Sequence, residues 1–202
     1  MKLILGSILL ILLPLAFLKL CYALSTVFVL RKTKGALFVS TSRAKIRAIL
    51  EAVPMGPETK LVDLGCGDGR FLRAAYKKYG VCGVGFEINP WAYFLARCWN
   101  FLARIPVKIK RKNFLEEDLS PYDFIFCYLF PDLLLELAPK LEREARPGTI
   151  IVSANFPLPG WRPYLTLKVE DPLYFYRIPP DRGVSKSVKN AKNYKECGSK
   201  DF

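Results

Sequence analysis

The chain of 202 residues has no histidine and no pair of cysteines at Cys-x-x-Cys spacing. The absence of histidine excludes Ser-His and Cys-His nucleophilic catalysis, and it excludes histidine as a general base. A zinc site would need cysteines brought together from distant parts of the chain. We therefore interpret the six cysteines as structural, buried thiols in a reducing compartment, and we expect no bound metal.

Charge is nearly absent from residues 3–30, where Lys19 is the only charged side chain. A helix of this length would measure about 42 Å, and roughly 20 apolar residues cross a bilayer core. We therefore expect residues 1–30 to form a transmembrane anchor helix. A cleaved secretory signal is the alternative, because Cys21 and Ala23 fit a small-x-small cleavage site. The apolar run continues past that site, however, and is longer than an ordinary signal core.

The charges that flank the apolar run predict its orientation. Only Lys2 precedes the run, whereas three basic residues follow it: Arg31, Lys32 and Lys34. By the positive-inside rule, the C-terminal side of such a segment stays in the cytoplasm. The sequence thus predicts a single-pass membrane protein with a basic linker at residues 31–40 and a cytoplasmic domain after it.

Acidic residues are few, since 18 Asp and Glu stand against 31 Lys and Arg, for a net charge of +13. Part of the excess lies in residues 181–202, a polar and basic stretch that we expect to be a disordered tail. Anionic lipid headgroups are a candidate partner, because each basic residue near such a surface contributes about 1 kcal/mol. Nucleic acid is the rival partner. The tail does not interleave aromatic and basic residues, so we favour lipid or simple solvation.

Helix and strand patterns alternate through residues 41–180, which we interpret as one catalytic domain. This alternation predicts a parallel sheet with helices on both faces, in which ligands bind at the carboxyl ends of the strands. A terminal antiparallel pair is expected from "YLTLKVE" and "LYFYRI". The predicted helices begin near residues 41, 70, 89 and 131, and the predicted strands near residues 61, 81, 107, 122 and 148.

The stretch "LVDLGCGDGR" from Leu61 to Arg70 follows the first predicted strand and contains three glycines. A dinucleotide fingerprint, G-x-G-x-x-G, would need glycine at the position of Arg70. The spacing is instead D-x-G-x-G-x-G, beginning at Asp63. An acid there suits a cofactor with a positive amino group and would repel a pyrophosphate. Glu87 ends the next strand, 22 residues after Gly65, where acids accept hydrogen bonds from ribose hydroxyls.

This loop resembles motif I of the class I S-adenosylmethionine (SAM) dependent methyltransferases. Two other interpretations stay open: a dinucleotide oxidoreductase, and a glycine turn with no ligand. The resemblance extends to four runs, which occur in the order "FVSTSRAKI", "LVDLGCGDGR", "VGFEINPW" and "NFPLPGWRP". Together, between Phe38 and Tyr176, they resemble the small membrane-anchored lysine methyltransferases of the adenine nucleotide translocase and the ATP synthase c subunit.

The resemblance implies a Rossmann-like α/β fold with a seven-stranded, mostly parallel sheet. It also implies SAM as cofactor and a lysine of a membrane protein as methyl acceptor. The methionine end of SAM would bind Asp63, Gly65, Gly67 and Gly69, and Glu87 would hold the ribose. Asn113 lies where the family has an acid that reaches the adenine amino group. The N-terminal segment is not Arg-rich and amphipathic as a mitochondrial transit peptide would be, so a prokaryotic relative fits better.

Transfer to lysine requires a neutral amine, and at pH 7 only about one free lysine in 2,500 is neutral. Burial in an aromatic slot lowers the lysine pKa and tolerates a methylated ammonium. Aromatic residues are expected at the ends of the fourth and fifth strands, so we assign Phe156 and Trp161 as slot walls, with Tyr128 beside them. The alternative is that they only pack the substrate-side loop. Asp132 is a weaker candidate, because the helix dipole alone explains an acid at its position.

Three other functions compete with lysine methylation. The charge of +13 suggests methylation of RNA or a small molecule. The N-P-P-[YF] tetrapeptide of amino-nucleobase methyltransferases is absent after the fourth strand, where "YLFP" stands, and this weakens the nucleobase version. The third alternative is a membrane scaffold that binds SAM without turnover.

Overall fold

The structure is a computed structural model that describes residues 12–14, 16–17, 19–20, 40–179 and 189–190. Among these residues, no helix is long and apolar enough to cross a bilayer. The predicted anchor at residues 1–30, the linker at 31–40 and the tail at 181–202 lie mostly outside the described residues and stay predictions.

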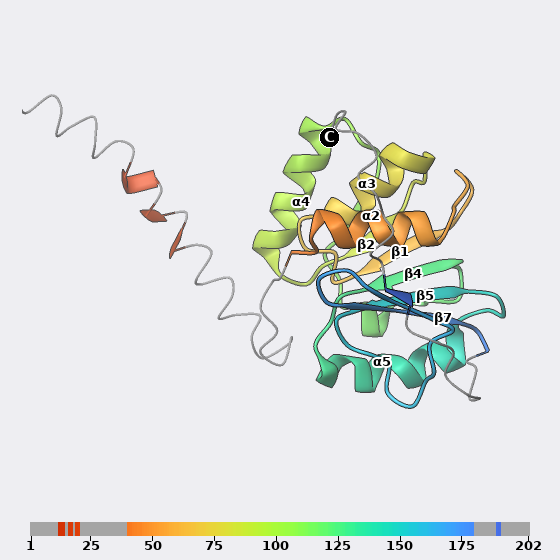
Figure 1. The fold of residues 1–202 in the computed structure, drawn as a ribbon. Coiled ribbons are helices and arrows are strands. Elements are labelled where there is room, and N and C mark those ends of the chain that lie inside the picture. The colour runs from red at the N-terminus through yellow and green to blue at the C-terminus, as the bar shows by residue number, and fades with distance from the viewer. Residues whose placement is uncertain (1–11, 15, 18, 21–39, 180–188, 191–202) are drawn as a thin grey trace, which may run out of the picture.

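One mixed sheet organises residues 40–179 (Figure 1). Its order is β3-β2-β1-β4-β5-β7-β6-β8, and β1 to β5 are parallel. The expected seven-stranded, mostly parallel sheet is thus present, with a two-residue β8 added at one edge. The strands are β1 (Leu61–Leu64), β2 (Val84–Phe86), β3 (Lys108–Lys110), β4 (Phe124–Cys127), β5 (Ile150–Ala154), β6 (Leu165–Lys168), β7 (Pro172–Arg177) and β8 (Lys189–Asn190).

The last two long strands pair antiparallel, as predicted, but their placement was not predicted. β7 lies between β5 and β6 and runs antiparallel to both. After β5 the chain therefore skips the position next to β5 and forms β6 one position further out. It then returns as β7 between the two. This return brings residues that precede β7 beside the end of β5, which matters for the site described below.

Helices cover both faces of the sheet. Figure 1 shows α2, α3 and α4 on one face and α5 on the other. Local signals explain several boundaries: the Ser42 hydroxyl accepts from the Lys45 N–H at the start of α2, and Gly80 ends α3 in the left-handed conformation. The helices are α2 (Arg43–Ala52), α3 (Arg70–Tyr79), α4 (Pro90–Leu102), α5 (Pro131–Glu144) and a short 3-10 helix, η1 (Phe114–Glu116).

Each face of the sheet has its own apolar core, and the strands supply the two cores by alternation. In β4, Phe124 and Phe126 pack against Phe71 of α3, whereas Ile125 and Cys127 face α5. By the same alternation, Tyr128 packs on the α2/α3 face, at the carboxyl end of β4. The alternation of side chains along the strands thus determines which residues can line a site on that face.

The four cysteines that the structure describes are free thiols. Cys66 and Cys127 are buried, as expected for structural thiols, and burial raises the pKa of both. Cys98 is half-buried and Cys82 is exposed, so the expectation of burial does not hold for Cys82.

Candidate active site

A cavity lies at the carboxyl ends of β1 and β4, on the α2/α3 face. Its lining includes Thr41, Asp63, Gly65, Asp68, Arg70 and Tyr128. Three residues predicted from separate parts of the sequence, Asp63, Gly65 and Tyr128, thus meet at one cavity. The position agrees with the rule that ligands of such sheets bind beyond the carboxyl ends of the strands.

The glycine loop turns through left-handed backbone conformations, with φ of 75° at Gly65, 55° at Gly67 and 76° at Gly69. A side chain at these angles is strained, and a Cβ at Gly65 would lie 3.1 Å from the Leu129 Cδ2 atom. The loop is also fixed to β2, because the Gly65 and Cys66 N–H groups donate to the Phe86 carbonyl at 2.9 and 3.0 Å. The glycines are therefore required by the turn itself.

Glu87 connects the glycine loop to α4. Its Oε2 atom accepts from the Gly67 N–H at 2.9 Å, and its Oε1 atom accepts from the Asn89 N–H at 2.8 Å. Burial raises the pKa of the Glu87 carboxyl, although backbone N–H groups that donate to it act in the opposite direction. The residue predicted to hold the ribose is therefore buried at the end of β2 and oriented by two backbone donors.

Asp63 is 3% exposed at the end of β1. Its pKa is raised well above the usual range, first by burial and then by the negative charges of Glu87 and Asp68. Among the residues that the structure describes, no three His, Cys, Asp or Glu side chains are placed to share a metal ion. A buried acid cluster of this kind is stabilised by a cationic ligand with hydroxyl donors, and it repels a pyrophosphate. SAM, with its ammonium, sulfonium and ribose, fits this donor set.

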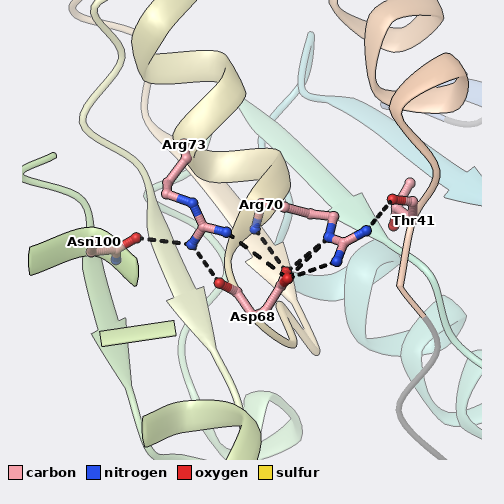
Figure 2. A network of polar contacts seen from close by, with 5 residues as sticks. All are labelled: Thr41, Asp68, Arg70, Arg73 and Asn100. Carbon is pink, nitrogen blue, oxygen red and sulfur yellow. Dashed lines mark hydrogen bonds and ion pairs between the residues drawn. The ribbon is translucent and has the colours of Figure 1, made fainter. Parts of the chain in front are cut away.

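Asp68 anchors a polar network that holds the loop from both sides (Figure 2). Its carboxylate accepts from Arg70 Nη2 at 2.8 Å, and Arg73 Nη1 donates to its backbone carbonyl. Arg70 also donates to the Thr41 carbonyl before α2, and Arg73 to the Asn100 side chain of α4. Sequence patterns did not assign this role to Asp68, although an acid two residues before an arginine at a helix start is a readable signal.

A second cluster lies beside Tyr128. No role was predicted for its residues, although Lys45 lies in the run "FVSTSRAKI" and Asn155 begins the run "NFPLPGWRP". The Lys45 side chain is buried, and its Nζ atom donates to Asn155 Oδ1 at 2.7 Å and to Asp171 Oδ2 at 2.6 Å. Lys45 Nζ also lies 5.2 Å from the centre of the Tyr128 ring. The hydrogen bond and charge of Lys45 lower the pKa of Asp171.

Asn155 joins this cluster to the cavity. Its Nδ2 atom donates to the Tyr128 hydroxyl at 2.9 Å, so one amide contacts both Lys45 and Tyr128. Its backbone is left-handed, with φ of 69°, a conformation that asparagine tolerates better than most residues. The available signal was a lysine on the buried side of α2, because a buried lysine needs a partner.

The predicted aromatic slot is only partly assembled. Phe156 is half-buried, and its ring centre lies 6.3 Å from that of Phe130. Trp161 is 7% exposed and packs edge-on against Tyr176 in the core on the α5 face, whereas Tyr128 packs on the other face. The position of Trp161 favours the alternative interpretation, a packing role.

Two other predicted residues have local contacts. Asn113 caps η1, where its Oδ1 atom accepts from the Leu115 N–H at 3.1 Å and its Nδ2 atom donates to Glu116 at 3.0 Å. Its contact with adenine stays a prediction. Asp132 is exposed at the second position of α5, as the helix-dipole explanation expects.

The fold and the site together define a SAM-dependent methyltransferase of class I. The solved structure of an RNA methyltransferase from Salinibacter ruber, in complex with S-adenosyl-L-homocysteine, is 30% identical with a TM-score of 0.67. That likeness covers 75% of this chain and 99% of the other. The same fold, at 20% identity and a TM-score of 0.50, occurs in a geranyl diphosphate C-methyltransferase from Streptomyces coelicolor.

Residues 63–165 match the family described as the ANTKMT methyltransferase domain, and the chain belongs to this family. A protein-lysine N-methyltransferase of Saccharolobus islandicus is 36% identical over 66% of this chain and 85% of its own length. The human lysine N-methyltransferase of the ATP synthase c subunit is 34% identical, and the mouse lysine N-methyltransferase of the adenine nucleotide translocase is 35% identical. The matches cover 62% of this chain in both cases, but only 55% and 56% of those relatives.

Proposed function

We propose that this chain transfers the methyl group of SAM to the ε-amino group of a lysine in a membrane protein. The observation that carries the lysine assignment is the similarity to relatives that are each named as lysine N-methyltransferases. The membrane-protein part rests on two of those names and on the apolar run at residues 3–30, in which Lys19 is the only charged residue.

The cofactor side of the site consists of the acids and the glycine loop. SAM, when bound, supplies an electrophilic methyl group on a sulfonium. Asp63 accepts from the cofactor's ammonium, and Glu87 from its ribose hydroxyls. Both assignments come from the family resemblance. The burial of these acids and their raised pKa values support them, because each carboxylate gains most from a ligand that brings positive charge or donors.

The acceptor side has to deliver a neutral amine. Lowering a lysine pKa by three units takes about 4 kcal/mol of differential interaction. Burial against the Tyr128 ring lowers that pKa. Lys45 lies over the same ring, but Asp171 and Asn155 already bind its ammonium. Tyr128 and Asn155 orient the incoming amine. Phe156, which pairs with Phe130, packs on the core of the α5 face, as Trp161 does. Asp171 neutralises Lys45 on its outer side.

The first experiment measures transfer of labelled methyl groups from SAM into native membranes of the source organism. The full chain is compared with Glu87→Ala and with Glu51→Ala, a matched change at an exposed glutamate of α2. We expect one small membrane protein to be labelled by the full chain and by Glu51→Ala, and hydrolysis to yield methyl-lysine. Glu87→Ala should leave it unlabelled.

Other outcomes identify the competing functions. Label in the RNA fraction would support the RNA alternative, for which the 30% identical solved structure named as an RNA methyltransferase is the specific observation. Label in a small-molecule fraction would show that the methyl acceptor is a small molecule. Measurable SAM binding without label in any fraction would leave the non-catalytic scaffold.

A further inference from the structure

Helix α4 carries apolar side chains on two sides. Its inward side buries small or polar residues, Ala92, Ala96 and Asn100. Its outward side exposes large ones: Phe94 is 59% exposed, Phe101 83% and Leu102 69%. At 3.6 residues per turn, seven residues separate Phe94 from Phe101 and bring them onto the same line of the helix.

Two tryptophans extend this surface. Trp91 stands one turn before Phe94, with the two ring centres 6.3 Å apart, and Trp99 is 48% exposed at its edge. We define the α4 stripe as Trp91, Phe94, Trp99, Phe101 and Leu102. Large apolar side chains in such a contiguous set mark an interaction surface, whereas scattered single ones do not.

Basic side chains border the stripe. Residues 88–115 contain no Asp or Glu, and all six of their lysines and arginines are exposed. Lys108 and Lys110 point to the opposite face of the sheet, because Ile109 between them packs on the α2/α3 face and Lys110 lies over the Phe86 ring. Lys112 pairs with Glu117. We define the basic rim as the other three residues: Arg97, Arg104 and Arg111. Arg97 lies on α4, Arg104 lies just after α4, and Arg111 follows β3 at the edge of the sheet.

Helix α5 provides the internal comparison. It also exposes one large apolar residue, Leu135, at 60%. The residues around it on the outward side are charged and exposed: Asp132, Glu136, Glu142 and Arg143. Both helices cover the same sheet, so the requirements of the core do not explain why α4 has a continuous apolar stripe and α5 does not.

We propose that the α4 stripe and the basic rim dock on the surface of an anionic lipid bilayer, with the axis of α4 along the membrane plane. Tryptophan concentrates at membrane interfaces, and a helix with an apolar side and basic neighbours buries that side at the headgroup boundary. A second copy of the chain is a poorer occupant, because the two basic rims would face one another. The docking is independent of the identity of the methyl acceptor.

The orientation that follows places the active site at the membrane. Helix α4 begins immediately after the carboxyl end of β2, and the Asn89 N–H donates to Glu87. The end of the stripe at Trp91 therefore lies near the edge of the sheet where the cofactor loop turns. An acceptor lysine that emerges from a bilayer would be presented at this edge.

The test uses the full chain and its three tryptophans, Trp91, Trp99 and Trp161. Residues 1–40 contain no tryptophan, so the N-terminal segment contributes no signal, and Trp161 is buried in the core. The chain is bound to vesicles of phosphatidylcholine and phosphatidylglycerol that carry brominated acyl chains. We expect strong quenching of the full chain, and weak quenching of a variant with Trp91→Phe and Trp99→Phe.

Neutralising the basic rim provides the second measurement. Each basic residue near an anionic surface contributes about five-fold to association. The triple variant Arg97→Gln, Arg104→Gln and Arg111→Gln should therefore shift the docking equilibrium by about a hundred-fold, and quenching should fall to its level in pure phosphatidylcholine. Phe94→Ser with Phe101→Ser should also abolish quenching, whereas Leu135→Ser on α5 should not. SAM affinity serves as the test that each variant is folded.

Two results would overturn the proposal. In the first, bromolipids fail to quench the tryptophans of the full chain, and an aqueous quencher still reaches them in the presence of vesicles. This result would show that α4 stays in water. A dimer in sedimentation that Phe94→Ser and Phe101→Ser dissociate would assign the stripe to a second copy instead.

Discussion

The proposed cofactor side and the proposed acceptor side of the site differ in their balance of charge. On the cofactor side, Asp63 and Glu87 are buried acids whose pKa values are raised. On the acceptor side, Lys45 is a buried cation that Asp171 and Asn155 already bind, and the pKa of Asp171 is lowered. The acids of the cofactor side need a positive ligand to balance their charge. The acceptor side already contains a positive charge, that of Lys45, as part of the fold.

Because of this difference, the two sides should affect the stability of the ligand-free protein in different ways. Buried acids that repel one another make the ligand-free protein less stable, in exchange for affinity toward a cation. The Lys45 cluster stabilises the protein with or without a ligand, because its hydrogen bonds are internal. Changes on the two sides should therefore have separable effects on SAM affinity, on acceptor kinetics and on the free energy of unfolding.

The largest expected effect is that of Glu87→Ala on SAM affinity. The change removes an acceptor of ribose hydroxyls and leaves the Gly67 and Asn89 N–H groups without their partner. Loss of a charged hydrogen-bond partner costs about 3 kcal/mol, or about a hundred-fold in the SAM Kd. Calorimetric titration with SAM measures it, with Glu51→Ala as the control. A Kd within about two-fold of the parent would remove Glu87 from the cofactor site.

Lys45→Met should break the acceptor side and spare the cofactor side. It removes hydrogen bonds to Asn155 and to Asp171, which is half exposed and finds water, so the free energy of unfolding should fall by about 2 kcal/mol. The kcat/KM for the acceptor should fall, and the SAM Kd should not change. Urea unfolding and steady-state kinetics test this, with Lys77→Met at an exposed position of α3 as the control. A parallel loss of SAM affinity would show that the two sides are not separate.

Asp63→Asn should move stability and affinity in opposite directions. It removes a buried negative charge that Glu87 and Asp68 repel, so the ligand-free protein should become about 1 kcal/mol more stable while it binds SAM more weakly. Thermal unfolding without and with SAM gives both quantities. A loss of stability in the ligand-free protein would contradict the description of Asp63 as a strained acid.

The pH dependence of SAM affinity follows from the same raised pKa values. Binding requires ionised Asp63 and Glu87, so affinity is constant above their raised pKa values and falls as the pH drops through them. The ligand-free protein has the opposite trend, since these acids favour folding in their protonated form. Calorimetry in buffers of different ionisation enthalpy should detect proton release on binding at acidic pH. The Asp63→Asn variant should release fewer protons.

The smallest expected effect is that of Tyr128→Phe. The ring against Lys45 remains, and only the hydroxyl that accepts from Asn155 Nδ2 is lost. One neutral hydrogen bond contributes about 1 kcal/mol, so the acceptor kcat/KM should fall about five-fold with the SAM Kd unchanged. Steady-state kinetics with the identified acceptor measures it. A larger loss, comparable to that of Lys45→Met, would give the hydroxyl a direct role in proton removal.

Sequence reasoning could assign residues to the cofactor side because the signals are local. The acid, the three glycines and Glu87 lie within 25 residues of one another, on two strands that pair directly. The acceptor side depends on contacts between Lys45 and two residues 110 and 126 positions away. These contacts require β7 to return between β5 and β6, and no local pattern encodes that return.

Trp161 illustrates a second limit of sequence reasoning. An aromatic residue after a strand fits a ligand slot and a core equally well, because both are apolar. The side of the sheet on which the loop folds decides between them, and Trp161 packs against Tyr176 on the α5 face.

The Asp68 network has a consequence for the entropy of SAM binding. Arg70 and Arg73 connect the cofactor loop to the segments before α2 and within α4. The Gly67 and Gly69 N–H groups donate to Glu87 and to the Cys66 carbonyl. Ordering a residue costs roughly 1–2 kcal/mol of conformational entropy. The cofactor loop is already ordered when the domain folds, so SAM binding does not carry this cost. Amide hydrogens of these glycines should therefore exchange with solvent only when the whole domain unfolds, whether or not SAM is bound.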